Sequence, residues 1–332
     1  MKIDLVYLWI DGDDTQLRER RSHFLPPERL RDIESFSAGR FSQSEELRYS
    51  LRSVELYAPW VNHIYIVTDN QIPRWLDLNY PKVTIIDQSQ ILPESALPTF
   101  NSTVVELGLA NIEGLSEYFL YANDDMLLCR EVKPDTFITA EGLMRGRFKT
   151  SKESAEQISK STYLTTIARV NEAIYRDFNV KMGGELRHLS PHHNIDIYSK
   201  SVIKEALECY SEWVDESMKS RFRSPNDMQR HLFSLYALAT GRAEAIDVRE
   251  GVYLKALKRL LCPSTGVESM VVNLPLSSFD RLRLRLYNPA MICVNDNEFA
   301  TSDDREVVRA FLEGLYPKRS AFELPALSTH NI

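Results

Sequence analysis

Two adjacent aspartates, Asp124 and Asp125, follow an apolar run over residues 117–122. Neighbouring carboxylates at the end of a buried strand repel each other, and desolvation adds to the cost of ionising each one. A divalent cation removes this cost, and Mg²⁺ is typically held by one or two carboxylates together with substrate phosphate oxygens. The motif therefore indicates an enzyme with a phosphate-containing substrate. The alternative is a solvated turn that follows a strand.

A group of histidines offers candidates for proton transfer. His188, His192 and His193 surround Pro191, and Asp196 is nearby. Imidazole and carboxylate groups bind zinc, but Pro191 prevents the helix that would align His188 with His192. An unperturbed imidazole titrates near neutral pH, so a general base is favoured over a zinc site. Surface or packing histidines are the remaining alternative.

Two arginines offer positive charge for a phosphate. Arg221 and Arg223 directly precede the segment 224–227, Ser-Pro-Asn-Asp, which has the residue types of a helix N-terminus. Guanidinium groups beside backbone N–H donors make a good phosphate site, and a plain surface turn is the alternative. The chain has no P-loop motif, no GxGxxG and no GxSxG. Functions built on those motifs therefore lack support.

The first half of the chain alternates strand and helix patterns around these groups. Strands are expected at residues 2–10, 61–68, 83–87 and 117–122. This alternation predicts an α/β fold with a mostly parallel central sheet and flanking helices. Sites in such sheets lie beyond the carboxyl ends of the strands. Asp11, Asp69 and Asp124 each follow such an end, which strengthens the functional interpretation of all three.

Capping signals mark two helices in this half. Ser42 and Glu45 have the spacing of a capping box, and the helix that they open buries apolar residues at helical spacing. These apolar residues are Leu47, Leu51 and Val54. Asn101 or Ser102 caps a second helix that extends to Ile112.

The second half is more helical. Helices are expected at residues 164–178, 202–210, 224–240 and 302–315. Residues 281–286 alternate Arg with Leu, which fits a strand or a helix with a solvated or phosphate-facing stripe of arginines. A buried strand at 290–294 leads into a second acidic turn at 295–298. Since no Gly/Ser linker divides the chain, we predict one catalytic domain over 1–332, with a more helical insertion at about 140–260.

Composition limits the class of protein. The 332 residues are 43% hydrophobic and 26% charged, as is ordinary for a globular protein, and the net charge of −7 disfavours nucleic-acid binding. No apolar run is long enough to span a membrane, and the N-terminus enters a strand pattern rather than a signal peptide. The four cysteines are far apart and are predicted to be reduced thiols. These features predict a cytoplasmic protein.

Four blocks of residues, in chain order, carry a resemblance to a known family. They are Ile3 to Gly12, Arg40 to Asp125, His188 to Asp196 with Arg223 to Gln229, and Cys293 to Asn297. Together they resemble the Stealth family of sugar-1-phosphate transferases, which includes bacterial capsular polysaccharide phosphotransferases and the catalytic subunit of GlcNAc-1-phosphotransferase. The third block of the family has the order His-x-Pro. Here the order is His188-Leu189-Ser190-Pro191-His192, so the family histidine corresponds to either His188 or His192.

The resemblance implies a nucleotide-sugar-transferase-like, GT-A-like fold and a specific reaction. Family members move a hexose with its phosphate from a nucleotide sugar, usually a UDP-sugar, to a glycan hydroxyl. The products are a phosphodiester and a nucleoside monophosphate, and the setting is capsule or cell-surface polysaccharide synthesis. The expected cofactor is Mg²⁺ or Mn²⁺. The expected partners are the donor, a glycan or polysaccharide acceptor, and a membrane-bound export or assembly complex at the inner face of the membrane.

The resemblance also implies roles for individual residues. The expected metal ligands are Asp124, Asp125 and Asp296. His188 is the expected base, with His192 and then Asp69 as alternatives, and Arg223 is expected to neutralise charge on the phosphate. The residues expected to bind nucleotide, phosphate and sugar are Asp11, Gly12, Arg52, Gln71, Asn101 and Glu106.

Two other functional classes compete with this one. A GT-A-like, metal-dependent glycosyltransferase would use the same acidic motif but attack the sugar carbon and release a nucleoside diphosphate. A non-catalytic nucleotide-sugar-binding protein would not require Arg223 and Asp296 to converge with Asp124. The histidine block and Arg223 favour phosphotransfer over both alternatives.

Overall fold

The computed structural model describes residues 1–25, 45–150, 153–182, 189–248, 266–297 and 299–325. Its central sheet has five strands in the order β3-β2-β1-β4-β8. They are β1 (Ile3–Leu8), β2 (Ile64–Thr68), β3 (Val83–Asp87), β4 (Tyr118–Asn123) and β8 (Asp196–Ser199). The first four are parallel and β8 is antiparallel to β4. The predicted α/β fold with a mostly parallel sheet is confirmed.

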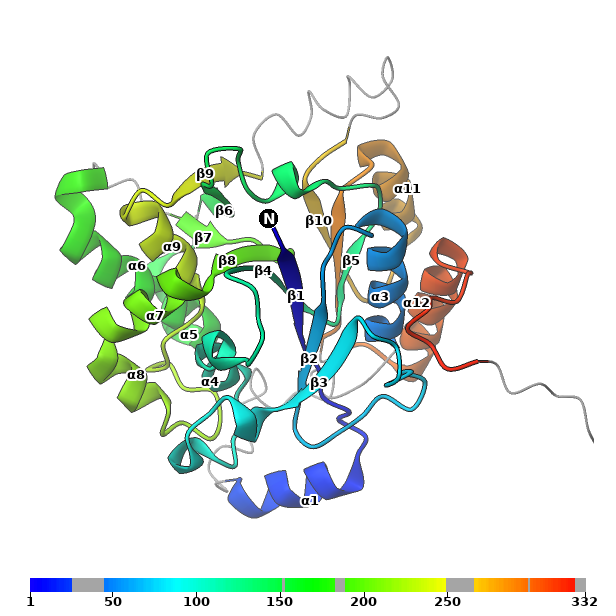
Figure 1. Ribbon diagram of the computed structural model, residues 1–332, viewed down its shortest axis with the longest axis horizontal. Helices are drawn as coiled ribbons and strands as arrows, with labels where there is room; N and C mark the ends of the chain where they lie inside the picture. The colour runs from blue at the N-terminus through cyan, green and yellow to red at the C-terminus, as the bar shows by residue number, and fades with distance from the viewer. Residues whose placement is uncertain (26–44, 151–152, 183–188, 249–265, 298, 326–332) are drawn as a thin grey trace, which may run out of the picture.

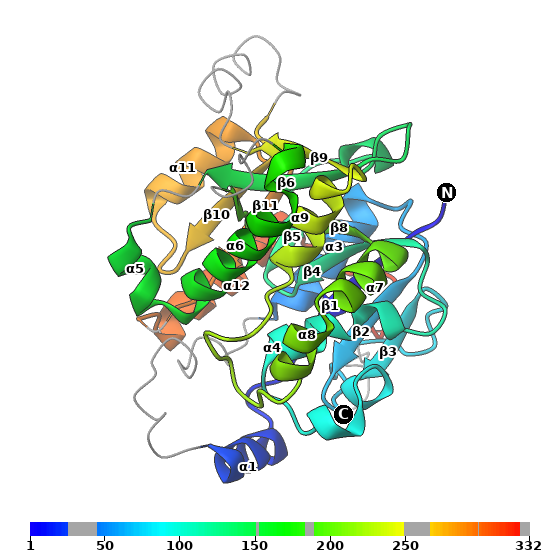
Figure 2. The ribbon, with the colours of Figure 1, turned by 90° about the vertical axis from the view of Figure 1, so that its left-hand side faces the viewer.

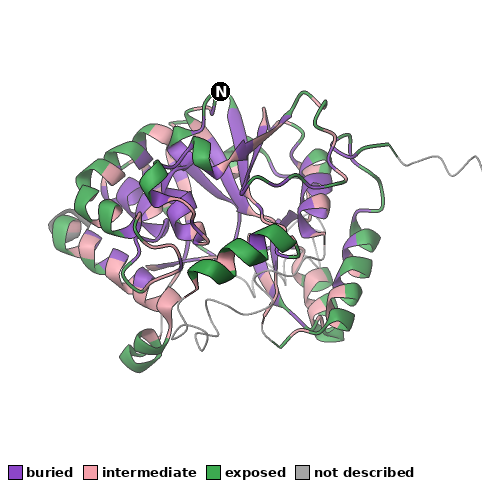
Figure 3. Cartoon of the chain, turned by 90° about the horizontal axis from the view of Figure 1, so that it is seen from below, coloured by how far each residue is buried: buried purple, intermediate pink, exposed green. Residues whose placement is uncertain are grey.

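Helices cover both faces of this sheet (Figures 1 and 3). Strand β1 is apolar except for Asp4 and is almost wholly buried, as expected when both faces of a strand are covered. Helix α3 (Glu46–Tyr57) buries Leu47, Leu51 and Val54 against the sheet, as predicted. Helix α4 (Ser102–Leu107) begins at the predicted cap, where the Asn101 side chain accepts from the Thr103 N–H.

A second sheet lies beside the first and has the order β10-β11-β5. Its strands are β10 (Ser269–Asn273), β11 (Met291–Asn295) and β5 (Met126–Leu128). Helices α11 (Ser278–Tyr287) and α12 (Ser302–Leu315) belong to this part of the molecule. Leu127, Ile292 and Leu312 belong to a separate hydrophobic core there.

The middle of the chain forms a helical region with a small sheet of its own. The sheet consists of β7 (Leu189–Pro191), β6 (Met144–Thr150) and β9 (Ala243–Asp247). The helices are α5 (Ala155–Lys160), α6 (Thr162–Met182), α7 (Lys200–Cys209), α8 (Ser211–Ser217) and α9 (His231–Ala239). Figure 2 shows these helices together on one side of the central sheet. Helix α1 (Thr15–Phe24) lies apart from them, beyond the ends of the central strands (Figure 1).

Two local predictions need correction. Helix α3 has Glu45 as its N-cap in the left-handed region, without a side-chain cap, and Ser42 lies outside the described residues. Ser224 and Asp227 form a turn rather than opening a helix, because their hydrogen bonds close a loop, and α9 begins only at His231. Residues 281–286, for which a strand and a helix were both open, are helical and belong to α11.

Two further expectations concern membranes and cysteines. In the part of the chain that the structure describes, no helix is both long and apolar enough to cross a bilayer. Cys129, Cys209 and Cys293 are free thiols, and Cys262 lies outside the described residues.

Candidate active site

Strand register brings the predicted acidic residues to one edge of the central sheet. Leu8 at the end of β1 pairs with Val67 of β2 and with Asn123 of β4. The residues that follow these strands therefore emerge at the same edge, since carboxyl ends of parallel strands coincide. They include Asp11, Asp69 and Asp124, as the sequence predicted.

The Asp124–Asp125 turn is the point where the chain leaves the central sheet for the second sheet. Asp125 Oδ2 accepts from the Cys293 thiol at 3.2 Å, while its Oδ1 is buried with no hydrogen-bond partner. Burial raises the pKa of Asp125 to about 6, and the Cys293 thiol opposes this shift. A buried carboxylate oxygen without a partner, beside a second carboxylate, suits Mg²⁺ held by one or two carboxylates and substrate phosphates.

The third predicted metal ligand, Asp296, lies near this turn, but its carboxylate is paired with Arg305. The Val294 N–H donates to the Asp125 carbonyl at 2.9 Å, so the end of β11 adjoins the Asp124–Asp125 turn. The Asp296 carboxylate, however, accepts from Arg305 Nε at 2.7 Å and Nη2 at 3.2 Å. Among the described residues, no group of three His, Cys, Asp or Glu side chains is assembled for a metal. The three predicted ligands are therefore not gathered into one cluster within the described residues, and their metal-binding role stays a prediction.

Buried hydrogen bonds lead inward from the acidic turn. The Tyr121 hydroxyl donates to Glu106 Oε1 at 2.8 Å and lies 3.0 Å from Asn123 Oδ1. Glu106 is buried, and burial raises its pKa, while Arg230 opposes this shift. The prediction that Glu106 contacts the sugar is therefore replaced by a position within the protein, one layer behind the acidic turn.

Arg230 is the centre of this buried network. Its Nε lies 3.3 Å from Glu106 Oε1, and its Nη1 donates to Asp196 Oδ2 at 2.5 Å. The guanidinium carbon lies 4.8 Å from the centroid of the Tyr121 ring. Burial raises the pKa of Asp196, and Arg230 opposes this shift as it does for Glu106. We call Glu106, Arg230 and Asp196 the buried triad.

The histidine segment is attached to the other end of the triad. Asn194, which is fully buried, donates through Nδ2 to Asp196 Oδ1 at 2.8 Å and to the His192 carbonyl at 3.2 Å. His192 Nδ1 is hydrogen-bonded to Ser269 Oγ at 2.9 Å, and Ser269 begins β10. The network thus extends from the acidic turn on the central sheet to the second sheet.

The other histidines of this segment are placed differently. His193 stacks on Tyr163 with ring centroids 6.0 Å apart. His188, the predicted base, lies outside the described residues. Residues 189–191 form strand β7, so no helix aligns the histidines for zinc.

Arg223 lies close to the triad. Its Nη2 donates to Ser102 Oγ at 2.7 Å, and Ser102 is the first residue of the helix that carries Glu106. Its positive charge lowers the pKa of Glu106, although less than Arg230 does. Nearby Asn101 is buried and donates to Asp227 Oδ2 at 2.7 Å, so its predicted sugar contact is replaced by a role in joining two loops.

Two loops at the sheet edge hold the remaining predicted residues. The Gln71 side chain forms two hydrogen bonds with the Asp11 backbone, at 2.9 and 3.0 Å, and Gly12 accepts from Arg18 at 2.8 Å. Asp69 is buried and accepts from Arg20 Nη2 at 2.8 Å. Burial raises the pKa of Asp69, and Arg20 opposes this shift.

Arg52 has a position that differs from the prediction. It is buried and donates to both carboxylate oxygens of Glu323, to Glu313 and to the Tyr316 carbonyl. These bonds occupy its guanidinium group within the fold. Arg52 therefore anchors the C-terminal segment to α3 and is removed from the set of phosphate-binding candidates.

Comparisons with known proteins decide the family. The family models of Stealth protein conserved region 2 and conserved region 4 match residues 40–145 and 281–331, respectively. The exopolysaccharide phosphotransferase cps2G of Lactiplantibacillus plantarum is 32% identical over 321 residues, which cover 86% of this chain and 91% of that protein. The chain belongs to the Stealth family. The two matched regions contain the Asp124–Asp125 turn and Asp296, and the histidine segment lies between them.

Other relatives have related names. The exopolysaccharide phosphotransferase SCO6023 of Streptomyces coelicolor is 37% identical over 97% of this chain, and this Stealth chain covers 52% of that protein. The capsular polysaccharide phosphotransferase LcbA of Neisseria meningitidis is 36% identical over 70% of this chain and 63% of its own length. Among solved structures, the galactosyltransferase LgtC in complex with donor and acceptor sugar analogs aligns over 98% of both chains, with 11% identity and a TM-score of 0.43.

Arg230, the residue at the centre of this Stealth site, was not predicted from the sequence. Arg230 directly follows the block that ends at Gln229, but a single arginine next to a helix carries no signal of burial. Tyr121 belongs to an apolar run that predicted only a strand. Two buried acids distant in sequence, Glu106 and Asp196, needed a shared cation, and this requirement was the one available hint.

Proposed function

We propose that this Stealth protein transfers a hexose-1-phosphate unit from a nucleotide sugar, such as a UDP-sugar, to a hydroxyl of a glycan or polysaccharide acceptor. The product is a phosphodiester in a capsule or cell-surface polysaccharide, and a nucleoside monophosphate is released. The names of the relatives support this class of reaction.

The observation that carries the proposal is the continuous buried network from Asn123, beside the acidic turn, to His192. Phosphoryl transfer requires metal-binding carboxylates, a cation for the phosphate and a proton acceptor in fixed relative positions. The network connects all three. Asn123 adjoins the Asp124–Asp125 turn, Arg223 bonds to the helix that carries Glu106, and the other end of the network reaches His192. Since Asn194 and the members of the triad are buried and hydrogen-bonded, their positions are set before substrate arrives.

Asp124 and Asp125 would hold the divalent cation, Mg²⁺ or Mn²⁺. The ion, when bound, would neutralise charge on the donor pyrophosphate. Arg223 would bind the phosphate oxygens, since its planar fork of donors matches them. The loops of Asp11, Gly12 and Gln71 would position the nucleotide at the sheet edge, where ligands bind in such folds.

The chemical step exchanges one bond to phosphorus for another. The acceptor oxygen bonds to the phosphorus that carries the sugar, while the bond from this phosphorus to the bridging oxygen breaks. The nucleoside monophosphate leaves with that electron pair, and the acceptor proton passes to an imidazole. Among the described histidines His192 is a candidate, because the bond between its Nδ1 and Ser269 Oγ holds the imidazole in place at the end of the network. His188, which lies outside the described residues, remains the predicted base, and His192 is the alternative.

The test is to identify the nucleotide that is released. The purified protein is incubated with Mg²⁺, an oligosaccharide acceptor and a panel of UDP-sugars, and nucleotides are separated by anion-exchange chromatography. We expect UMP, in equal amount to new phosphodiester detected by ³¹P NMR, and no UMP from the Asp125→Asn variant. Release of UDP with a new glycosidic bond would instead identify a metal-dependent glycosyltransferase. Nucleotide-sugar binding without turnover across the panel would identify a binding protein.

A further inference from the structure

Helix α11 exposes an apolar stripe. Phe279, Leu282 and Leu286 have exposed fractions of 66%, 50% and 48%. Their spacing of three and four residues places them on one face of the helix. No residue of α11 is fully buried, although the helix is ten residues long. Single exposed apolar residues are ordinary, but three that share one face of a helix indicate a contact surface.

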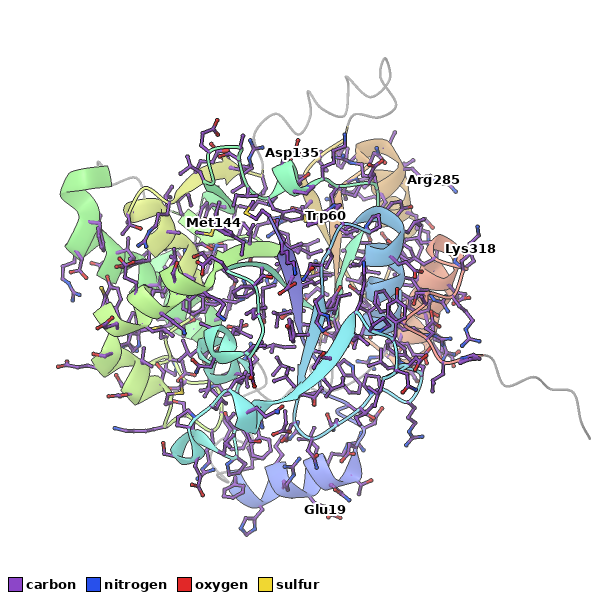
Figure 4. All side chains as sticks on the ribbon, in the orientation of Figure 1. Glu19, Trp60, Asp135, Met144, Arg285 and Lys318 are labelled. Carbon is purple, nitrogen blue, oxygen red and sulfur yellow. The ribbon has the colours of Figure 1, made fainter. Side chains whose placement is uncertain are left out.

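The opposite face of α11 is the one that packs on the protein. Leu284 and Tyr287 contact the core of the second sheet, and they lie on the other side of the helix from Leu282. Helix α11 lies at the outer edge of the molecule, where Arg285 is labelled in Figure 4. The stripe therefore points away from the body of the protein.

Arginines flank the stripe on both sides. Helical geometry places Arg283 along one border and Arg281 with Arg285 along the other. Arg281 and Arg285 are exposed, while Arg283 lies 3.4 Å from Asp280 and over the Phe279 ring. The chain as a whole has a net charge of −7, so this basic border departs from the overall charge of the protein. It is complementary to an anionic surface.

The topology relates this face to the candidate active site. Strands β10 and β11 are parallel, and α11 connects them, so the helix runs antiparallel to both strands. The Phe279 end of α11 therefore lies toward the edge where β11 ends and Asp296 follows. A surface bound by this stripe would be held beside the edge that carries the acidic turn.

We propose that α11 docks this protein on an anionic lipid surface, with Phe279, Leu282 and Leu286 inserted and the arginines facing the headgroups. An interfacial helix has an apolar face bordered by Lys or Arg, and it binds by apolar burial together with attraction to anionic lipids. The proposal goes beyond the proposed function, because docking does not require catalysis. It gives the expected membrane association a defined surface.

The test is co-sedimentation of the full chain with vesicles of phosphatidylcholine alone or of phosphatidylcholine with phosphatidylglycerol. We expect binding to the anionic vesicles that weakens with added salt. Leu282→Gln with Leu286→Gln should weaken it about tenfold or more, and Arg281→Gln with Arg285→Gln about tenfold. The matched control is Leu78→Gln, since Leu78 is 50% exposed but lies outside α11, and it should bind as the wild type does.

Each variant is also measured for thermal unfolding and for nucleotide release with a soluble acceptor, neither of which should change. Because the arginine variant alters only exposed side chains, it tests the proposal even if the leucine variant fails to fold. Equal binding to both kinds of vesicle, or anionic binding unaffected by the α11 variants, would overturn the proposal. So would light scattering that shows a wild-type dimer and a monomeric leucine variant, because the stripe would then be a subunit interface.

Discussion

The buried triad and the Asp124–Asp125 turn are two charged groups at the same sheet edge, and they differ in how their charge is balanced. In the triad, Arg230 lies between the two carboxylates and bonds to both. At the turn, Asp125 accepts a hydrogen bond from the Cys293 thiol and has one buried oxygen without a partner. Both groups contain carboxylates whose pKa is raised by burial.

The triad is a completed group of buried ion pairs, whereas the turn is the proposed site of a cation. A buried ion pair that is complete keeps its members in place, and removing one partner leaves an uncompensated buried charge. A buried carboxylate with no partner costs stability on its own and recovers that cost when a cation binds. Substitutions in the two groups should therefore have opposite effects on stability.

The largest effect on activity is expected for Asp125→Asn. Loss of a metal-binding carboxylate should lower kcat/KM by about 10³-fold or more, since a bound metal ion supplies several kcal/mol to the transition state. The same variant should bind Mn²⁺ with UDP more weakly in electron paramagnetic resonance titrations. Asp135→Asn, an exposed substitution, is the control. Unchanged activity or Mn²⁺ binding in Asp125→Asn would remove Asp125 from the metal site.

In the absence of a cation, the Asp125→Asn variant should be more stable to unfolding than the wild type. The pKa of Asp125 is raised from 3.8 in the unfolded reference to about 6, so the folded protein holds this proton longer. The wild type therefore loses stability as pH rises from about 4 to about 6, and the variant does not. We expect a gain of up to about 3 kcal/mol above pH 6 that vanishes below pH 4. Urea unfolding across this range measures it, and a loss of stability at pH 7 would contradict the assignment.

The triad should behave in the opposite way. Arg230→Met leaves Glu106 and Asp196 without their shared cation, and it should destabilise the protein by about 3–5 kcal/mol at neutral pH. Adding Glu106→Gln and Asp196→Asn to this variant should recover part of the loss. Arg242→Met is the matched control, because the Arg242–Glu205 pair is partly exposed and should contribute less than about 1 kcal/mol. If urea unfolding shows equal losses of stability for Arg230→Met and Arg242→Met, the triad contributes no more to stability than a partly exposed ion pair.

Substitution of the histidines tests whether the general base is the residue at the end of the network. His188→Ala and His192→Ala are compared by monophosphate release and by donor binding. The base should lose about 10²-fold or more in kcat while donor affinity stays unchanged, because it contacts the acceptor proton. We expect the larger loss for His188→Ala, and a larger loss for His192→Ala would move the assignment to the residue attached to the triad. His63→Ala is the control, since His63 bonds to Thr84 on the central sheet.

The smallest effect is expected for Arg223→Lys. Lysine keeps the positive charge but loses the planar fork that matches phosphate oxygens. We expect kcat to fall about tenfold to 100-fold, with a smaller change in KM. Arg221→Lys is the control, because Arg221 donates to the Pro98 carbonyl and lies over the Phe24 ring. Wild-type kcat in Arg223→Lys would argue against contact with the reacting phosphate.

Some of this protein follows from local sequence. The mostly apolar runs at β1, β2, β3 and β4 predicted the parallel sheet, because strands covered on both faces are largely apolar. The α12 helix covers the range predicted from the sequence, 302–315. The position of Asp11, Asp69 and Asp124 at one edge also followed, since parallel strands end together.

Other features depended on which distant residues meet. The alternating Arg and Leu at 281–286 fit a strand or a helix, and the packing of Leu284 and Tyr287 on the second core selected the helix. Nothing near Arg52 in the sequence indicates Glu323, which occupies its guanidinium group from 271 positions away. Likewise Asp296 is adjacent to the acidic turn, but its pairing with Arg305 depends on how α12 packs.

The sequence by itself therefore determined the residue types, the strand ends that carry them and the family. Tertiary structure decided which charges are compensated. Local propensity depends on neighbours a few residues apart, whereas desolvation and pairing depend on all atoms around a side chain. Arg230 joins Glu106 and Asp196 only because α4, β8 and the start of α9 meet behind the acidic turn.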